Sequence, residues 1–259
     1  MNPAKVIDIR GRKLGAETPL ICTPLVGRSR ENVLAEAATV AAKEPDVIEW
    51  RVDYFADIAN SSAVLETAKA LRAAIGDTPL IFTRRSSKEG GEPIAIDDAG
   101  VVRLYDAVSA SGLVDFLDFE MANDPGQLRQ VRDNARSHGV RTIFSYHNFA
   151  DTPGEDFLVE RFLQAEEQGA DVAKVAVMPR ERMDVLTLLV ATARADAKAR
   201  IPLISMSMGP LGAVTRMVGG VFGSSLSFAV GAAASAPGQI PIADLAIVYD
   251  VIRRARGGK

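Results

Sequence analysis

The chain has 259 residues, of which 47% are hydrophobic and 24% are charged, and its net charge at neutral pH is −3. This composition is typical of a soluble globular protein, and the mildly acidic balance gives no support for binding to nucleic acid or to an anionic membrane. No apolar stretch reaches the roughly 20 residues that a membrane-spanning helix needs, and the charged, alternating N-terminus does not resemble a signal peptide. The single cysteine, Cys22, excludes an internal disulfide framework or a cysteine metal site. We therefore expect a cytoplasmic protein.

Residues 5–18 alternate apolar and polar positions, which predicts a small hairpin, within residues 1–18, that closes the base of the main fold. From residue 19 onward, apolar runs alternate with helical patterns at roughly the 30-residue spacing of a βαβ unit. The first four predicted strand–helix pairs are residues 19–26 and 29–43, 46–50 and 61–75, 79–83 and 97–111, and 113–120 and 124–138. The next four are residues 140–147 and 153–168, 171–178 and 180–199, 202–208 and 213–218, and 225–230 and 242–254.

Eight such units in about 250 residues predict a (β/α)8 TIM barrel that forms a single domain over residues 1–259. An open doubly wound sheet is the structural alternative, but it usually has fewer strands, and the first strand–helix turn, TPLVGRSR, lacks a Gly-rich dinucleotide fingerprint. In a (β/α)8 barrel, catalytic groups lie at the C-terminal ends of the strands. The polar residues at those ends are therefore the candidate site.

One lysine, Lys174, lies in the middle of the apolar run DVAKVAVM, which predicts a buried strand. Burial disfavours the ammonium form and leaves part of the lysine as a free amine, which is the form that attacks a ketone to make a Schiff base. The structural alternative is a lysine near a strand end whose stem is packed and whose head reaches water. The run alone leaves both interpretations open.

The two histidines of the chain occupy different kinds of position. His138 is predicted in the last turn of a helix, just before Gly139, where a cation suits the helix dipole and the glycine ends the helix. His147 lies at the end of the strand that precedes the lysine strand. Because adjacent strands are about 4.8 Å apart, His147 and Lys174 are predicted to reach one small substrate. Histidine is also well suited to moving protons at neutral pH.

Charged residues alternate at the ends of the second and fourth predicted strands. EWRVDYF places Glu49, Arg51 and Asp53 on one face of an extended segment. This row either binds a polyhydroxylated ligand or forms structural ion pairs at the barrel mouth. LDFE places Asp118 and Glu120 on one face. Two acids inside a barrel need positive partners, for which Arg51 and the strand lysine are the candidates.

A loop rich in charge and glycine follows the third strand. In FTRRSSKEGGE, the residues Arg84, Arg85, Lys88 and Glu89 crowd a short stretch that ends in two glycines. Arg84 and Arg85 face opposite sides, so only one of them is expected to point inward. Such a loop at a barrel mouth is predicted to be functional rather than only solvated.

The last two strands supply apolar walls and polar donors. Met206 and Met208 share a face and either shape a pocket wall or pack in the core. Arg216 follows the seventh strand, and an arginine beside hydroxyl and amide donors suits a substrate carboxylate. The loop SAPGQIP after the eighth strand contributes Ser235, Ala236 and Gln239.

Together these motifs resemble the type I 3-dehydroquinate dehydratases of the shikimate pathway. The similarity runs from about residue 20 to residue 253 and rests on EWRVDYF, FTRRSSKEGGE, SYHNF, DVAKVAVMP, DVLTLL, the MSM stretch, VFGSS and SAPGQIP. The resemblance implies a metal-free and cofactor-free (β/α)8 barrel, expected as a homodimer. It implies that the barrel dehydrates 3-dehydroquinate to 3-dehydroshikimate through a lysine Schiff base. Since one histidine can both take the proton and return it to the departing hydroxyl, we expect syn elimination.

The resemblance also implies individual roles. Lys174 resembles the Schiff-base lysine, His147 the general acid and base, and Glu89 the acid that orients this histidine. Arg216 resembles the clamp for the substrate carboxylate. The positions that match the family's substrate pocket are Glu49, Arg51, Arg85, Met206, Met208, Arg216, Phe228, Ser235, Ala236 and Gln239. Thr23 lies where the spacing differs from that of relatives, so the resemblance assigns it no role.

Three functions remain open at this point: the Schiff-base dehydratase, another lysine-imine barrel such as a class I aldolase, and a non-enzymatic barrel that kept the pocket. The sequence also leaves open whether the role is biosynthetic or catabolic. The mouth loops 84–92 and 235–240 both contain glycines that a closing motion tolerates, and whether either closes on substrate is open as well.

Overall fold

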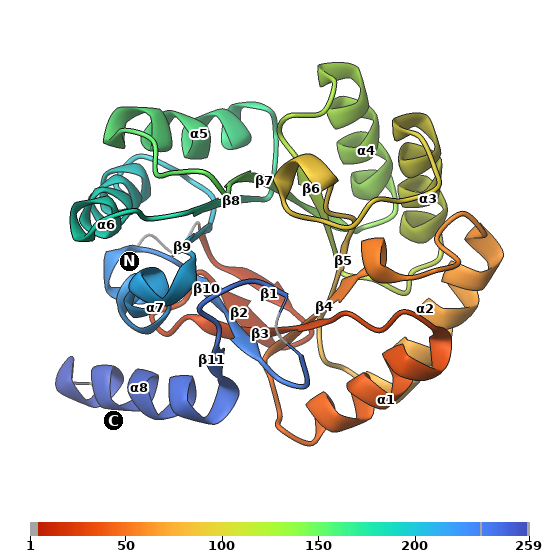
Figure 1. The fold of residues 1–259 in the computed structure, drawn as a ribbon, viewed down its shortest axis with the longest axis horizontal. Helices are drawn as coiled ribbons and strands as arrows, with labels where there is room; N and C mark the ends of the chain where they lie inside the picture. The colour runs from red at the N-terminus through yellow and green to blue at the C-terminus, as the bar shows by residue number, and fades with distance from the viewer. Residues whose placement is uncertain (1–4, 234, 258–259) are drawn as a thin grey trace.

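A curved parallel sheet surrounded by helices makes up the computed structural model, which describes residues 5–233 and 235–257 (Figure 1). The strands, in their order across the sheet, are β11 (Ile240–Pro241), β10 (Leu226–Val230), β3 (Leu20–Leu25), β4 (Val47–Arg51), β5 (Leu80–Thr83), β6 (Phe116–Glu120), β7 (Arg141–Asn148), β8 (Val172–Val177) and β9 (Leu203–Ser207). The helices are α1 (Arg30–Ala41), α2 (Ser61–Ile75), α3 (Asp98–Ala110), α4 (Pro125–Ser137), α5 (Glu155–Glu167), α6 (Arg182–Asp196), α7 (Gly209–Val218) and α8 (Ile242–Ala255).

The sheet closes on itself between β9 and β10. Leu203 and Ser224 form a parallel bridge, and the N–H of Ser225 donates to the carbonyl of Leu203 at 2.7 Å. Each of the strands from β3 to β10 is followed in the chain by one of the helices α1 to α8, which form the outer ring in Figure 1. The predicted (β/α)8 barrel is therefore confirmed.

The predicted boundaries differ from the observed ones mainly at two places. The fourth predicted strand begins at residue 113, whereas β6 begins at Phe116, because the chain bends at Asp115 just before the strand. The short helix predicted at residues 213–218 begins earlier, at Gly209, since Pro210 is well tolerated in a first helical turn. Ser29 caps the N-terminus of α1, because its side chain accepts a hydrogen bond from the backbone N–H of Asn32.

An antiparallel hairpin, β1 (Ile7–Ile9) paired with β2 (Arg12–Leu14), precedes the barrel as expected. Its apolar side chains pack against Val47 and Phe116 at the N-terminal ends of β4 and β6. The hairpin thus covers the end of the barrel opposite to the site described below. Residues 1–4 of the predicted hairpin region lie outside the described residues.

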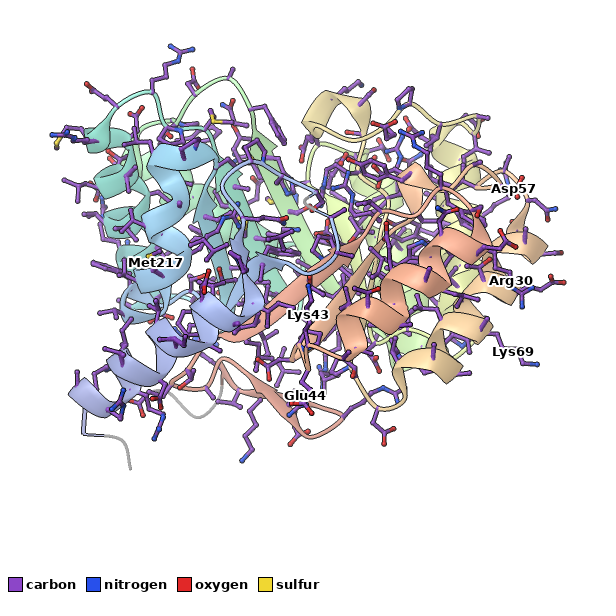
Figure 2. All side chains as sticks on the ribbon, turned by 60° about the horizontal axis from the view of Figure 1, so that its bottom comes forward. Arg30, Lys43, Glu44, Asp57, Lys69 and Met217 are labelled. Carbon is purple, nitrogen blue, oxygen red and sulfur yellow. The ribbon has the colours of Figure 1, made fainter. Side chains whose placement is uncertain are left out.

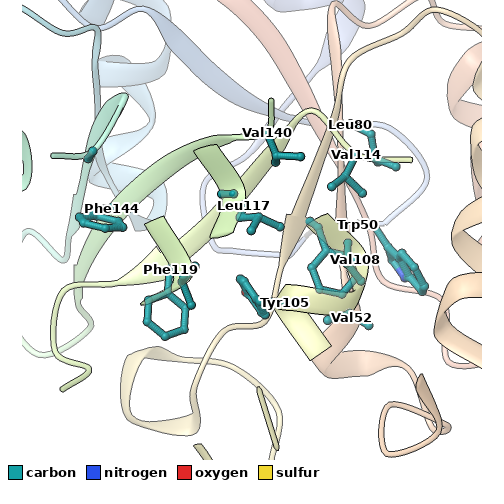
Figure 3. Close-up of a cluster of buried hydrophobic side chains, with 14 of the residues drawn as sticks. Trp50, Val52, Leu80, Tyr105, Val108, Val114, Leu117, Phe119, Val140 and Phe144 are labelled. Carbon is teal, nitrogen blue, oxygen red and sulfur yellow. The ribbon is translucent and has the colours of Figure 1, made fainter. Parts of the chain in front are cut away.

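The main apolar core lies between the sheet and the helices. Figure 3 shows part of it, including Trp50, Tyr105 and Phe119. Trp50 packs edge-on against Phe82, and Phe82 packs edge-on against Tyr105. Aromatic pairs in this geometry add stability beyond the area that they bury. Because successive side chains of a strand face opposite sides, this core uses every second residue and leaves the alternate residues for the barrel interior. In the described part of the chain, no helix is long and apolar enough to cross a membrane.

Candidate active site

The register of the strands decides which polar side chains enter the barrel. On β8, Ala173 and Val175 face the helices, so Lys174 between them faces the interior. Ser145 of β7 pairs with Lys174. His147 pairs with Ala176, two residues further along both strands. The predicted neighbourhood of His147 and Lys174 on adjacent strands is therefore confirmed, with the histidine nearer the C-terminal ends.

Lys174 is buried, with 4% of its surface exposed, and its amine is held by acidic and aromatic groups. Its Nζ donates to an Asp118 carboxylate oxygen at 2.7 Å and lies 3.8 Å from Glu49 Oε1. It also lies 4.5 Å from the centre of the Phe228 ring. The head of this lysine does not reach bulk water, which contradicts the structural alternative for a lysine in this run. Instead, the amine sits at the floor of a cavity.

Asp118 joins the lysine to a second buried cation, Arg85. Its Oδ1 accepts from Arg85 Nη2 and from the Ser145 hydroxyl, both at 2.7 Å. Burial alone would raise the pKa of Asp118, but the neighbouring Arg85 and Lys174 charges outweigh burial and hold this pKa well below its usual range. The carboxylate is therefore ionised and fixes both cations.

The prediction of positive partners for Asp118 and Glu120 was half correct. Lys174 does pair with Asp118, but Arg51 pairs with Asp53 instead, at 2.7 Å. The positive partner of Glu120 is Arg85, whose Nη1 donates to Glu120 Oε1 at 3.1 Å. Arg85 continues the alternation of β5, in which Ile81 and Thr83 also face the barrel interior. Arg84 lies outside the barrel, 3.9 Å from Asp98, so only one of the two arginines points inward, as expected.

His147 is held by Glu89 through both its ring and its backbone. Glu89 Oε2 lies 2.9 Å from His147 Nδ1 and accepts from the His147 backbone N–H at 3.0 Å. Burial lowers the pKa of His147 well below its usual value, and the Arg85 and Lys174 charges lower it further, so the ring is neutral. Burial also raises the pKa of Glu89 to about 8, although Arg85 opposes this shift.

This pair shares a proton in a way that suits acid–base work. When Glu89 is ionised, it accepts from Nδ1–H, and His147 Nε2 has a free lone pair that can take a proton. When Glu89 carries the proton, it donates to Nδ1, and Nε2 carries hydrogen. Because the two groups are in contact, they titrate as a pair rather than independently.

Arg216 of α7 is a buried guanidinium without a carboxylate partner among the described residues; its exposed fraction is 1%. It donates to the backbone carbonyls of Gly238, Pro237 and Phe228 at 2.9–3.3 Å. Burial lowers the pKa of Arg216 to about 10, which still leaves it charged at neutral pH. A buried charge of this kind is a ready binding site for an anion.

The loop between β10 and β11 contributes Ser235, Ala236 and Gln239 to the site. The Ser235 backbone N–H donates to Gln239 Oε1 at 3.1 Å, and Gln239 Nε2 donates to the Ser235 hydroxyl at 3.3 Å. Met206 and Met208 are almost fully buried and form an apolar wall beside Arg216.

One cavity brings all of these groups together. Its empty space is about 460 Å³, including the part open to solvent. Every predicted catalytic or substrate-binding residue lines it: Lys174, His147, Glu89, Glu49, Arg51, Arg85, Met206, Met208, Arg216, Phe228, Ser235, Ala236 and Gln239. Thr23 does not line this cavity, because its hydroxyl donates to the Ala229 carbonyl at 3.1 Å.

Sequence reasoning missed Gly90, Phe149 and Ala176, which also line the cavity. The Phe149 ring lies against Gly90, where an added Cβ would be 2.3 Å from the ring. Phe149 follows His147 by two residues, and this short distance from a candidate catalytic residue could have indicated that it lines the cavity. Ala176 gave no chemical signal, but the alternation along the lysine strand would have found it.

Comparison with known proteins gives a consistent result. The sequence model of the Type I 3-dehydroquinase family matches residues 21–256. The 3-dehydroquinate dehydratase of Albidiferax ferrireducens is 52% identical over 258 residues, which cover 99% of this chain and 98% of the relative. That of Aromatoleum aromaticum is 48% identical over 260 residues and the full length of both proteins.

Solved structures agree with this similarity. The crystal structure of 3-dehydroquinate dehydratase from Geobacillus kaustophilus superposes with a TM-score of 0.95 at 45% identity, covering 96% of this chain and 97% of its own. A type I 3-dehydroquinate dehydratase from Clostridium difficile, crystallised with covalent modified comenic acid, gives a TM-score of 0.94 at 36% identity. This match covers 97% of this chain and 99% of the other.

Proposed function

The chain belongs to the type I 3-dehydroquinase family, and we propose that Lys174, His147 and Glu89 carry its reaction at the barrel mouth. The reaction is that of a hydro-lyase of the shikimate pathway, the dehydration of 3-dehydroquinate to 3-dehydroshikimate and water. The predicted family and reaction are thereby confirmed over the aldolase and binding-protein alternatives. The observation that carries the assignment of residues is the buried Lys174 amine beside a histidine held by Glu89.

The first half of the reaction builds an electron sink. The Lys174 amine attacks the ketone carbon, and the resulting carbinolamine loses water to leave an iminium on Nζ. Before the attack, the Lys174 ammonium, which donates to Asp118, gives one proton to the neutral His147 ring in this assignment. His147 then returns this proton to the carbinolamine hydroxyl, which leaves as water, so the ring is neutral again before the elimination.

The second half is the elimination. His147 Nε2 removes a proton from the carbon next to the iminium carbon, the C–H electron pair forms a C=C bond to the iminium carbon, and the C=N electron pair moves onto the nitrogen to give an enamine. The enamine expels the hydroxyl group two carbons from the imine carbon, and the protonated His147 returns its proton to that group, which leaves as water. One base on one face gives syn elimination. Hydrolysis of the conjugated iminium then releases the product and restores Lys174.

The remaining lining residues hold the substrate in this assignment. Arg216 binds the carboxylate, since it is a buried cation that, among the described residues, donates to backbone carbonyls and the Met206 sulfur but to no carboxylate. Glu49 and Arg51, at the end of β4, face the cavity as acceptor and donor for hydroxyl groups. Met206 and Phe228 form the apolar walls against which the carbon ring packs.

Reduction with borohydride in the presence of 3-dehydroquinate tests this assignment. Mass spectrometry of the digested protein is expected to find the reduced adduct on Lys174, while enzyme without borohydride shows rising absorbance of the conjugated product. Lys174→Met is expected to lose both adduct and turnover. Lys69→Met is the matched control, because Lys69 is exposed on α2, far from the cavity lining, and is labelled in Figure 2.

The outcomes separate the possible errors. Turnover without a trapped adduct would contradict the imine mechanism, and an adduct on another lysine would contradict the role of Lys174. Adduct formation without dehydration, together with cleavage of a C–C bond in another ketone, would indicate an aldolase instead.

Two further expectations belong to this proposal. We expect a homodimer in the cytoplasm, and exposed apolar side chains on the neighbouring helices α6 and α7, such as Leu186, Val190, Leu211 and Val214, are compatible with a partner. The chain mass is 27.6 kDa, so light scattering behind a sizing column is expected to give twice that value. A mass of one chain at micromolar concentration would contradict the dimer.

A further inference from the structure

Asp53 does not line the cavity, yet its carboxylate binds both ends of the segment that carries Glu89. We call residues 85–92 the Glu89 segment. Asp53 Oδ1 accepts from the Arg85 backbone N–H at 3.2 Å, and Oδ2 accepts from the Glu92 backbone N–H at 3.1 Å. Since the side chain of Asp53 is completely buried, water does not compete for either oxygen.

The orientation of this carboxylate is itself fixed by Arg51. Arg51 Nε donates to Oδ1 at 2.8 Å and Nη2 donates to Oδ2 at 2.7 Å, which is the two-pronged geometry that arginine forms with carboxylates. The Arg51 guanidinium also lies 5.0 Å from the centre of the Tyr54 ring. Each Asp53 carboxylate oxygen therefore accepts two hydrogen bonds, one from the Arg51 side chain and one from the backbone of the Glu89 segment. These four bonds fix the orientation of the carboxylate.

The Glu89 segment is short and internally tight, so fixing its ends fixes its middle. The backbone N–H groups of Glu89 and Gly91 both donate to the Ser86 carbonyl, at 3.0 and 2.8 Å. Gly91 approaches the start of the segment so closely that an added Cβ would lie 2.0 Å from the Arg85 carbonyl oxygen. A shift at either end therefore displaces the Glu89 carboxylate from His147.

We propose that Asp53 is a positioning residue for the elimination, because it holds the Glu89 segment and thereby the contact between Glu89 and His147. This inference rests on the proposed function of Glu89 and His147. A purely structural ion pair at the end of β4 is the competing explanation. The two differ in one respect: a positioning role acts through Glu89, whereas a structural role does not depend on which side chain stands at position 89.

The first test is Asp53→Asn, which keeps the shape of the side chain but turns one acceptor oxygen into a donor. We expect kcat to fall on the order of 10- to 100-fold, as for other small misplacements of reacting groups. In a Glu89→Gln background the same replacement is expected to lower kcat less than about threefold further, since the effects of residues that act as one unit do not add. Asp57→Asn is the matched control, because Asp57 is exposed on the same stretch of chain and is labelled in Figure 2.

Nitrogen NMR of the imidazole rings gives a second readout that a structural role would not move. The chain has only two histidines, so His138, the C-cap residue of α4, serves as an internal reference. In Asp53→Asn, the Nδ1 signal of His147 is expected to move toward its position in Glu89→Gln, while the His138 signals stay in place. A folded Asp53→Asn protein with an unchanged His147 signal would overturn the proposal, as would a full additional loss of kcat in the Glu89→Gln background.

Gly91→Ala keeps the proposal testable if Asp53→Asn does not fold. It displaces the Glu89 segment by its contact with the Arg85 carbonyl and leaves Asp53 and Arg51 intact. The same loss of kcat and the same movement of the His147 signal are expected, and normal turnover in this variant would overturn the proposal. Failure of the wild-type enzyme to form the Lys174 adduct would instead overturn the proposed function, so the two failures are distinguishable.

Discussion

Removal of the Asp118 charge tests the central electrostatic feature of the site. Asp118 is completely buried and binds Lys174, Arg85 and the Ser145 hydroxyl, each at 2.7 Å. Asp118→Asn preserves the volume of the side chain but leaves two buried cations without their shared anion. Loss of one partner from a buried ion pair costs about 3–5 kcal/mol of unfolding free energy. In a protein of this size that corresponds to a Tm lower by about 6–20 °C.

Thermal unfolding by calorimetry or circular dichroism at neutral pH measures this loss. Asp57→Asn makes the same chemical change at an exposed site and is expected to change stability by less than about 0.5 kcal/mol. Adding Lys174→Met to Asp118→Asn removes one of the two cations that have lost the Asp118 carboxylate, so part of the lost unfolding free energy should return. The expected interaction energy between the two replacements is about 0.5–3 kcal/mol. A loss below about 1 kcal/mol for Asp118→Asn, or strictly additive losses in the double variant, would refute the electrostatic account.

Three other changes have expected outcomes. His147→Ala should lower turnover by about 10²- to 10⁴-fold while calorimetry still detects binding of a substrate analogue whose ketone is reduced to an alcohol; near-normal turnover would contradict the role of His147. Because burial raises the pKa of Glu89 from 4.5 to about 8, its contribution to stability is present below pH 4.5 and is lost as pH rises through 8. The Tm of Glu89→Gln minus that of wild type should therefore increase between pH 5 and pH 8, and a flat or falling difference would contradict the raised pKa. Arg216→Leu should raise KM by about 10- to 100-fold, the value of one hydrogen bond to a charged group, and an unchanged KM in steady-state kinetics would exclude Arg216 as the carboxylate clamp.

The sequence by itself determined the architecture and the reactive side chains. Apolar runs with turn residues at both ends recur with amphipathic helices between them, and this local pattern is sufficient to predict a barrel. Lys174 and His147 were identifiable because a lysine inside an apolar strand and a histidine at the end of the preceding strand are unusual placements. Their adjacency followed from the parallel order of consecutive strands, which the structure confirms.

Only the tertiary structure decided which charges meet inside the barrel. Sequence reasoning offered Arg51 or Lys174 as the partners of Asp118 and Glu120. Lys174 does bind Asp118, but Arg51 binds Asp53, and Arg85 binds both inner acids. Alternation along a strand places a side chain inside the barrel, but its partner depends on how the chain turns after the strand ends. The fixing of the Glu89 segment by Asp53 is of the same kind, since it joins groups more than 30 residues apart in sequence. Local periodicity is encoded in a few neighbouring residues, while the pairing of buried charges is set by closure of the whole barrel.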